Sequence, residues 1–221
     1  MQITDRDYAR LKRLQIWTGV LPVGLFLISH LSTNARAIAG APAFDRGAAW
    51  INRLPGIAAF EVAAIALPML LHVGIGVALS TTAQAALDTR GYPRPALLIA
   101  QRASGIYLVA YVMFHVWATR LSPDRLAGGR DLFALMARQL EQPVVLTWHV
   151  LGVLAAAFHF GNGLAALAGP WGLDAGPRGR ALAARTGWIA TVVLAVAGLA
   201  ALLAFVDPAF RWLEPRTIVA R

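Results

Sequence analysis

The chain has 221 residues, of which 58% are hydrophobic and 14% charged, so it is more apolar than ordinary soluble domains. It contains no cysteine, which excludes disulfides, thiolate catalysis, thiolate-ligated haem and iron–sulfur clusters held by this chain. The net charge of +9 comes from basic residues spread over every loop, a pattern that favours lipid headgroups and partner proteins and argues against nucleic acid.

Five apolar stretches follow one another along the chain, and each is long enough to cross about 30 Å of hydrocarbon as a helix. The first continues well past the length of a signal peptide, so we expect it to remain in the protein. We therefore predict an all-α integral membrane protein with one transmembrane domain over residues 1–221, whose first four helices form a bundle. The five predicted helices cover residues 14–38, 58–82, 98–121, 143–167 and 185–206.

Two connecting segments are amphipathic. Residues 39–57 place Phe44, Trp50 and Leu54 among polar side chains, and residues 131–140 carry a broad apolar face. Both patterns are typical of short helices that lie along the membrane interface, so we expect such helices here.

Charge alone does not orient the helices. Lys and Arg are equally divided between the two sides of the predicted membrane domain. Only the basic cluster just before the first helix favours one orientation, with the N-terminus in the cytoplasm.

The histidines are the main candidates for chemistry. All five lie inside the apolar spans, where ionisable residues are costly and mark functional sites by default. His30, His72, His115 and His159 occur one per helix, each somewhat past the midpoint of its span. Because consecutive helices run in opposite directions, His30 and His115 share one level and His72 and His159 share another, roughly 10–15 Å away along the membrane normal.

Two such pairs suit two haems. A haem iron needs two trans ligands from opposite sides of a flat apolar ring, and neutral imidazoles in a bundle core supply them. Bis-histidine ligation leaves no open position on the iron, which favours electron transfer over oxygen chemistry. The alternative is that each histidine only makes an interhelical hydrogen bond.

His149 falls outside this pairing. It shares a level with His30 and His115 but lies on a different face of its helix from His159. We interpret it as an interface or hydrogen-bonding histidine, with a quinone pocket or a proton path as the other interpretation.

These histidines and the residues around them resemble the five-helix dihaem cytochrome b subunit of succinate dehydrogenases and fumarate reductases. The matching strings are GVLPVGLFLISHL (19–31), FEVAAIALPMLLH (60–72), QRASG with FHVWATRL (within 101–121) and GVLAAAFHFGNGL (152–164). The resemblance covers about residues 12–205, whereas His149 and the length of the third loop have no clear counterpart in the family pattern.

The resemblance implies the biological role. It implies that His30 and His115 ligate a distal haem b, and His72 and His159 a proximal one next to an iron–sulfur subunit. The chain is then expected to anchor that subunit and a flavoprotein, which carries the dicarboxylate active site, and to pass electrons to or from a membrane quinone. The resemblance favours menaquinone, and it implies a bacterial cytoplasmic membrane with the N-terminus in the cytoplasm.

Several charged and polar residues then become candidates for contacts with the cofactors. Arg102, together with Ser104, is a candidate for a proximal haem propionate, and Arg36 and Arg120 for a distal one. The other interpretation of each arginine is that it reaches lipid headgroups.

The quinone candidates lie near the distal level. Glu61 could take up protons in quinol chemistry or be a solvated interfacial residue. Ser29, Ser32 and Asn34 are candidates to line the same pocket, although such side chains often bond their own helix backbone.

Two other functions are open to a chain of this kind. One is the cytochrome b subunit of another quinone-linked dehydrogenase, and the other is a haem-free anchor or proton-coupled transporter that uses the histidines as relays. The residues do not decide between succinate oxidation and fumarate reduction.

Overall fold

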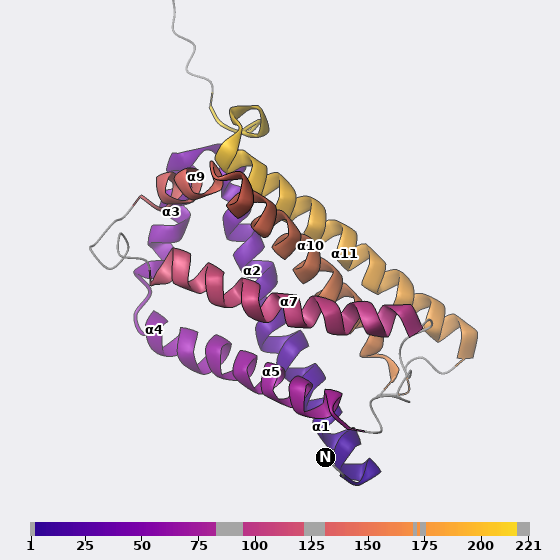
Figure 1. Ribbon diagram of the computed structural model, residues 1–221. Helices are drawn as coiled ribbons and strands as arrows, with labels where there is room; N and C mark the ends of the chain where they lie inside the picture. The colour runs from indigo at the N-terminus through magenta and orange to yellow at the C-terminus, as the bar shows by residue number, and fades with distance from the viewer. Residues whose placement is uncertain (1–2, 83–94, 122–130, 170–171, 173–175, 216–221) are drawn as a thin grey trace, which may run out of the picture.

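The computed structural model describes residues 3–82, 95–121, 131–169, 172 and 176–215 (Figure 1). Within these residues the chain is helical and has no strand. Five helices are long and apolar enough to cross a membrane, namely Asp5–Ala39, Ile57–Ser80, Ala96–Arg120, Pro143–Ala166 and Gly176–Val206. This arrangement confirms the predicted all-α membrane protein.

Each span is built from one or more helical segments. The first consists of α1 (Asp5–Thr18), η1 (Gly19–Val23), α2 (Gly24–Asn34) and η2 (Ala35–Ala39), and the second of α4 (Ile57–Phe60), η3 (Glu61–Ala66) and α5 (Leu67–Ser80). The other three are α7 (Pro95–Arg120), α10 (Pro143–Ala166) and α11 (Gly176–Val206). Three shorter elements lie between or after the spans, α3 (Ala41–Asn52), α9 (Leu132–Leu140) and η5 (Pro208–Phe210).

Two helices begin earlier than the hydropathy pattern predicts, at Asp5 instead of 14 and at Gly176 instead of 185. At the first of them, Thr4 is the N-cap, and its hydroxyl oxygen accepts a hydrogen bond from the backbone N–H of Asp7. Asp5 and Asp7 also place negative charge in the first turn, where the helix dipole favours it. The polar residues therefore continue the helix outside the membrane, which a search for apolar length does not detect.

Prolines alter the helix geometry of the first two spans. Pro22 lies inside the π-helical segment η1, and Pro68 follows the π-helical segment η3 at the start of α5. Proline has no N–H to donate and its ring crowds the preceding turn, so the backbone widens there to keep its other hydrogen bonds.

The closest helix packing joins α10 to α11. At their crossing Gly161 faces Gly187, and a Cβ on Gly187 would lie 2.5 Å from the Gly161 carbonyl oxygen. Small residues of this kind let membrane helices approach closely. In addition α10 packs on α7, α11 on α2, and α1 on α5.

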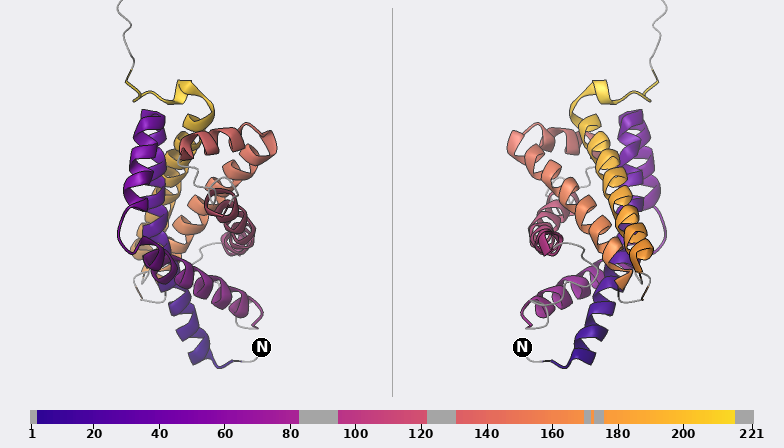
Figure 2. Two further views of the ribbon diagram at one scale, coloured as in Figure 1. Left: turned by 90° about the vertical axis from the view of Figure 1, so that its left-hand side faces the viewer. Right: turned by 90° about the vertical axis from the view of Figure 1, so that its right-hand side faces the viewer.

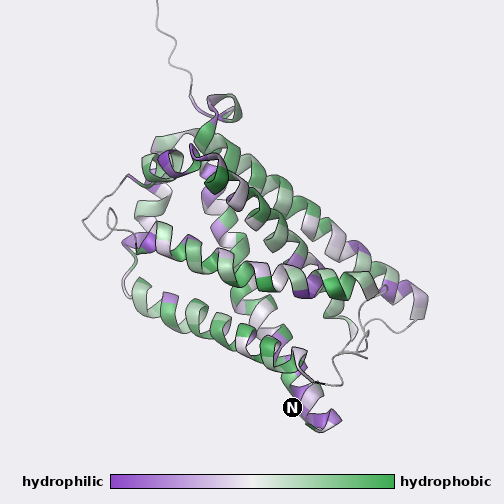
Figure 3. Cartoon of the chain, viewed as in Figure 1, coloured by the Kyte–Doolittle hydropathy of each residue, from purple (hydrophilic) through white to green (hydrophobic). Residues whose placement is uncertain are grey.

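The outer surface of the helices is apolar. Side chains such as Leu70, Ile106 and Val144 are exposed over 69%, 75% and 81% of their area. Figure 3 shows hydrophobic residues along the lengths of the long helices. A surface of this kind is suited to lipid rather than to water.

The two predicted interfacial segments are helices, but they bury their apolar faces within the protein. The rings of Phe44 on α3 and Phe133 on α9 both contact Phe205 at the end of α11, at centroid distances of 5.0 and 4.9 Å. Asp45 joins α3 to α9 through a 3.1 Å hydrogen bond from the Phe133 N–H to its carboxylate. Trp50 remains exposed. Both segments are therefore helices as predicted, and their apolar faces pack against the end of α11 at one end of the bundle (Figure 2).

Candidate functional site

The histidines meet in the two pairs predicted from their depths. His30 on α2 faces His115 on α7, with ring centroids 5.7 Å apart and ring planes nearly perpendicular at 89°. His72 on α5 faces His159 on α10 at 6.1 Å and 82°. Four helices thus each contribute one imidazole, whereas their role as haem ligands stays a prediction.

Helix α7 shows how far apart the two pairs lie. Ser104 on α7 contacts the His159 ring, and His115 lies eleven residues further along the same helix. At 1.5 Å per residue these positions are separated by about 16 Å. The two pairs therefore occupy different levels of the bundle.

The second ring nitrogen of His72 is held by a neighbouring helix. Its Nδ1 lies 2.7 Å from the carbonyl oxygen of Gln15 on α1. A carbonyl oxygen only accepts hydrogen bonds, so Nδ1 carries the hydrogen and a neutral ring keeps the lone pair of Nε2 free. This is the protonation state that a metal-binding imidazole needs.

His159 is held in the same way by α7. Its Nδ1 lies 3.2 Å from the Gln101 carbonyl oxygen and 3.1 Å from the Ser104 hydroxyl oxygen. The Ser104 hydroxyl donates its own hydrogen to the Gln101 carbonyl at 3.0 Å, so toward His159 it acts as an acceptor. The Gln101 side chain donates to the His159 carbonyl and accepts from Asn162, which ties α7 to α10 at this point.

Glycines make room for the rings of this pair. A Cβ on Gly19 would lie 2.5 Å from the His72 ring, and one on Gly105 would lie 3.0 Å from the His159 ring. Any larger residue at Gly19 would displace the imidazole. Gly19 lies on the first span beside the His72 helix, and Gly105 lies on α7 beside the His159 helix. The two helices have to be close neighbours at each of these contacts.

A charged network lies near the end of α7 that carries His115. Arg120 at the end of α7 forms a 2.6 Å ion pair with Glu61 and donates a 2.8 Å hydrogen bond to the side chain of Asn52. Two of the predicted candidates are therefore bonded to each other. Both side chains are more than one-third exposed, at 40% and 36%.

The other polar candidates occupy simpler positions. Ser29, Ser32 and Asn34 each donate to a carbonyl of their own helix, at 2.9, 2.8 and 2.9 Å. Arg36 is exposed and lies against Gly47 of α3, and Arg102 is exposed near the start of α7. The Asn34 side chain therefore bonds the backbone of one candidate ligand, His30, and Ser104 contacts the ring of another, His159.

His149 lies at the level that the sequence predicts, that of His30 and His115. The structure adds a neighbour that the sequence did not name, because the His149 ring lies 5.8 Å from that of His115. It is 2% exposed and also contacts the rings of Tyr111 and Phe114. The angle around α10 does not say which helix occupies that side, and the structure shows that α7 packs there.

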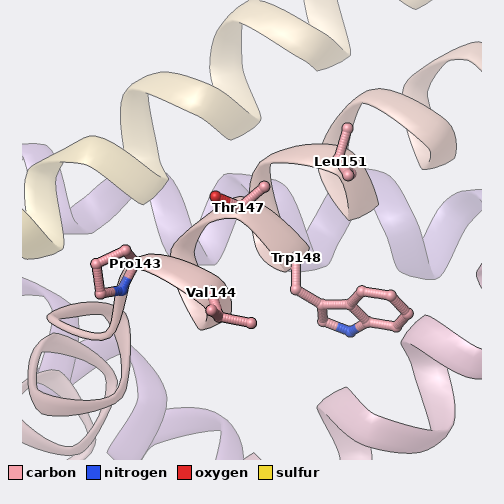
Figure 4. A pocket seen from close by; sticks show the side chains of 5 residues that line it. All are labelled: Pro143, Val144, Thr147, Trp148 and Leu151. Atoms are coloured by element: carbon pink, nitrogen blue, oxygen red, sulfur yellow. The ribbon is translucent and has the colours of Figure 1, made fainter.

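A shallow pocket of about 330 Å³ lies elsewhere on α10 (Figure 4). It is lined by Pro143, Val144, Thr147, Trp148 and Leu151. The Trp148 ring extends to α7, where it contacts Tyr107 at 4.8 Å. The lining includes none of the histidines, so this pocket is distinct from the candidate ligand pairs.

A comparison with known proteins places this geometry in context. The chain is 38% identical over 195 residues to the succinate dehydrogenase cytochrome b558 subunit of Bacillus subtilis (strain 168). The aligned residues make up 88% of this chain and 96% of that protein. The chain belongs to the succinate dehydrogenase cytochrome b subunit family. Family membership and the five spanning helices together make it a membrane subunit. No protein-family model matches the chain, and no solved structure matches it significantly.

Sequence reasoning missed several residues around the candidate ligands of this cytochrome b subunit. Gln101 and Asn162 were detectable as amide side chains within apolar helices, where an unpartnered polar group is costly. Gln15 could not be found, because it acts through its backbone carbonyl. Tyr111, which stacks on His115 at 5.7 Å and 24°, reads from the sequence as an ordinary aromatic residue of a membrane helix.

Proposed function

We propose that this chain carries electrons between an iron–sulfur subunit and a membrane quinone, through two b haems held by His72 with His159 and by His30 with His115. The first pair is assigned to the haem nearest the iron–sulfur subunit. The chain would also anchor the flavoprotein partner on which succinate or fumarate reacts. The name of the Bacillus subtilis relative, a succinate dehydrogenase cytochrome b subunit, supports the complex and the cofactor type.

The observation that carries the proposal is the pairing of the rings across four helices, at centroid distances of 5.7 and 6.1 Å. An imidazole nitrogen binds a metal ion from about 2 Å, so two histidines that would hold one haem iron between them need to face each other at a separation of this order. The orientation of the rings also fits. His72 and His159 donate from Nδ1 to α1 and α7, which leaves Nε2 as the metal-binding atom of each.

A haem b bound between such a pair supplies a one-electron centre. The residues of this chain provide the rest. Gln15, Gln101 and Ser104 keep the imidazoles of the proximal pair in one tautomer and orientation, and Gly19 and Gly105 leave space for the rings. The apolar helices exclude water from the path between the two levels.

Quinone chemistry is assigned to the end of the bundle that carries Arg120 and Glu61. Reduction of a quinone consumes protons, and Glu61 is a carboxylate near the distal pair that can deliver them. Arg120 holds this carboxylate through the 2.6 Å ion pair. Menaquinone is the expected substrate, and the expected location is a bacterial cytoplasmic membrane with the N-terminus in the cytoplasm.

The ligand assignment is tested by the variant His159→Ala. The purified wild-type complex is expected to contain two haems b per chain, seen as a b-type band in the reduced-minus-oxidised spectrum. The variant is expected to lose the proximal haem and to keep about one haem per chain. His149→Gln serves as the matched control, because it changes a buried histidine outside the pairs and is expected to retain both haems.

The outcomes separate the proposal from its alternatives. A wild-type chain without a b-type band would be a haem-free anchor or transporter, and the proposal would fail. Unchanged haem content in His159→Ala would refute the ligand assignment. Purification with a dehydrogenase that does not oxidise succinate or reduce fumarate would identify the cytochrome b of another quinone-linked enzyme.

A further inference from the structure

His149 has a buried ring nitrogen without a partner. The side chain is 2% exposed, and its Nε2 is buried and forms no hydrogen bond with the described part of the chain. Buried polar atoms in native structures almost always have a partner, so an exception requires an explanation. The proposed function, as stated above, does not use this atom.

The other nitrogen of His149 determines what Nε2 can do. Nδ1 lies 2.8 Å from the carbonyl oxygen of Val145, one turn earlier on α10. A carbonyl only accepts, so Nδ1 carries the hydrogen. In the neutral ring Nε2 is therefore a bare acceptor in an apolar environment.

Within the described residues, His115 has a buried ring nitrogen that lacks an acceptor, whereas the His149 Nε2 lacks a donor. The Nδ1 of His115 is also buried and without a partner in the described structure. A histidine that binds iron through Nε2 carries a hydrogen on Nδ1, and metal-ligating histidines nearly always donate this hydrogen to an acceptor. His72 and His159 have carbonyl acceptors on neighbouring helices, whereas His115 has none.

We propose that His149 is the positioning residue for His115: its Nε2 accepts the hydrogen bond of the His115 Nδ1–H when His115 binds iron. The ring centroids of His115 and His149 are 5.8 Å apart, and the ring planes are inclined at 68°. The bond requires the His115 Nδ1 and the His149 Nε2 to lie about 3 Å from each other. The ring of Tyr111 stacks on His115 and lies edge to face with His149, and the ring of Phe114 also contacts His149, so aromatic side chains of α7 keep the two imidazoles together. The inference rests on the proposed function, because it requires His115 to be a ligand.

The proposed bond has a measurable consequence. An acceptor on Nδ1 makes the imidazole a stronger electron donor and favours the oxidised over the reduced iron. Its loss should raise the midpoint potential of the distal haem. Substitution of groups that orient a ligand changes metal affinity by about 10-fold or more, and a tenfold change in the preference for one oxidation state corresponds to about 59 mV for one electron.

The experiment is a potentiometric titration of the purified complex, followed optically and by the electron paramagnetic resonance signals of the two haems. His149→Phe keeps an aromatic ring but removes the acceptor, so the distal potential should rise by about 59 mV or more and the distal signal should shift. His149→Gln offers a carbonyl acceptor and should restore much of the wild-type distal potential and distal signal. Tyr111→Phe changes the same cluster without removing an acceptor of the His115 hydrogen bond, so it should leave the distal potential and signal unchanged. The proximal haem of each variant is an internal control.

The possible results are distinguishable. If the wild type contains both haems and His149→Phe leaves the distal potential and signal unchanged, His149 has no positioning role. If both His149 variants lose the distal haem while His115→Ala retains it, His149 is itself the ligand, and the inference is overturned. Equal shifts in His149→Phe and His149→Gln would indicate packing and would also overturn it. Absence of a second haem in the wild type would instead refute the proposed function.

Discussion

At the scale of single residues, the candidate ligands differ in what holds their second ring nitrogen. His72 depends on a backbone carbonyl, while His159 shares its hydrogen between a carbonyl and the Ser104 hydroxyl. A side-chain acceptor can be removed by substitution, whereas a backbone carbonyl is present whichever residue occupies the position. Ser104 is therefore the position at which the orientation of a ligand is most directly tested.

We expect Ser104→Ala to weaken haem binding at the proximal pair without abolishing it. The Gln101 carbonyl remains 3.2 Å from the His159 Nδ1, so the effect should lie at the low end of the range for such substitutions, about tenfold. The rate of haem loss from the purified protein measures it. Ser80→Ala is the control, because Ser80 is exposed and its hydroxyl donates to the carbonyl of Val77 on its own helix. Equal haem loss from the wild type and Ser104→Ala would contradict the role.

Glu61 is the residue at which proton delivery can be tested. Glu61→Gln retains the shape of the side chain but removes the proton-accepting charge, so quinone-linked turnover should fall by about 100-fold or more if Glu61 acts as acid or base. Turnover with an artificial acceptor that bypasses the membrane subunit should be unchanged.

The haem content of Glu61→Gln serves as the structural control. A half-exposed ion pair contributes about 0–1 kcal/mol, so loss of the Arg120 contact should not unfold the protein. Normal quinone-linked turnover in a fully loaded variant would show that Glu61 only pairs with Arg120.

At the scale of secondary-structure elements, the close approach of α10 and α11 is the contact most sensitive to substitution. A Cβ at Gly161 would collide with the Gly187 carbonyl oxygen and with the Thr191 side chain. The backbone of α11 cannot rotate away as a flexible side chain could. His159 lies two residues earlier on α10, so the same contact positions a candidate ligand.

We expect Gly161→Ala to destabilise the protein by about 1–3 kcal/mol, the usual cost of overpacking. Thermal unfolding in detergent measures the loss. Gly74→Ala is the matched control, since a Cβ at Gly74 meets no atom within 4 Å and alanine favours the helix. A Gly161→Ala variant as stable as the wild type would mean that α10 and α11 can separate at no cost.

At the scale of the whole molecule, the orientation in the membrane decides which of the two proposed haems would lie next to the proposed iron–sulfur partner. The chain has no cysteine, so single cysteines can be introduced without removing any. Arg6 in α1 and Arg53 after α3 are both exposed and lie at opposite ends of the first span.

A membrane-impermeant thiol reagent is expected to label Arg53→Cys in intact cells and Arg6→Cys only after permeabilisation. The cysteine-free parent protein controls for background labelling. The reverse pattern would place the N-terminus outside and exchange the proximal and distal assignments.

Much of the fold follows from the sequence because a membrane imposes simple rules. Backbone groups in hydrocarbon have to be satisfied within the segment, so a long apolar stretch becomes a helix, and alternating helix directions place the histidines in two levels. The sequence alone therefore determined the five spans and the pairing of His30 with His115 and of His72 with His159.

Only the tertiary structure decided which side chains surround these pairs. The position of α7 beside α10 brings His149 to His115, the Gln15 carbonyl reaches His72 from another helix, and α3 and α9 turn inward onto α11. Periodicity gives the direction of a residue around its own helix but not the neighbour that occupies that direction. Those contacts depend on how close two helices can come, which glycines such as Gly161 and Gly187 set locally.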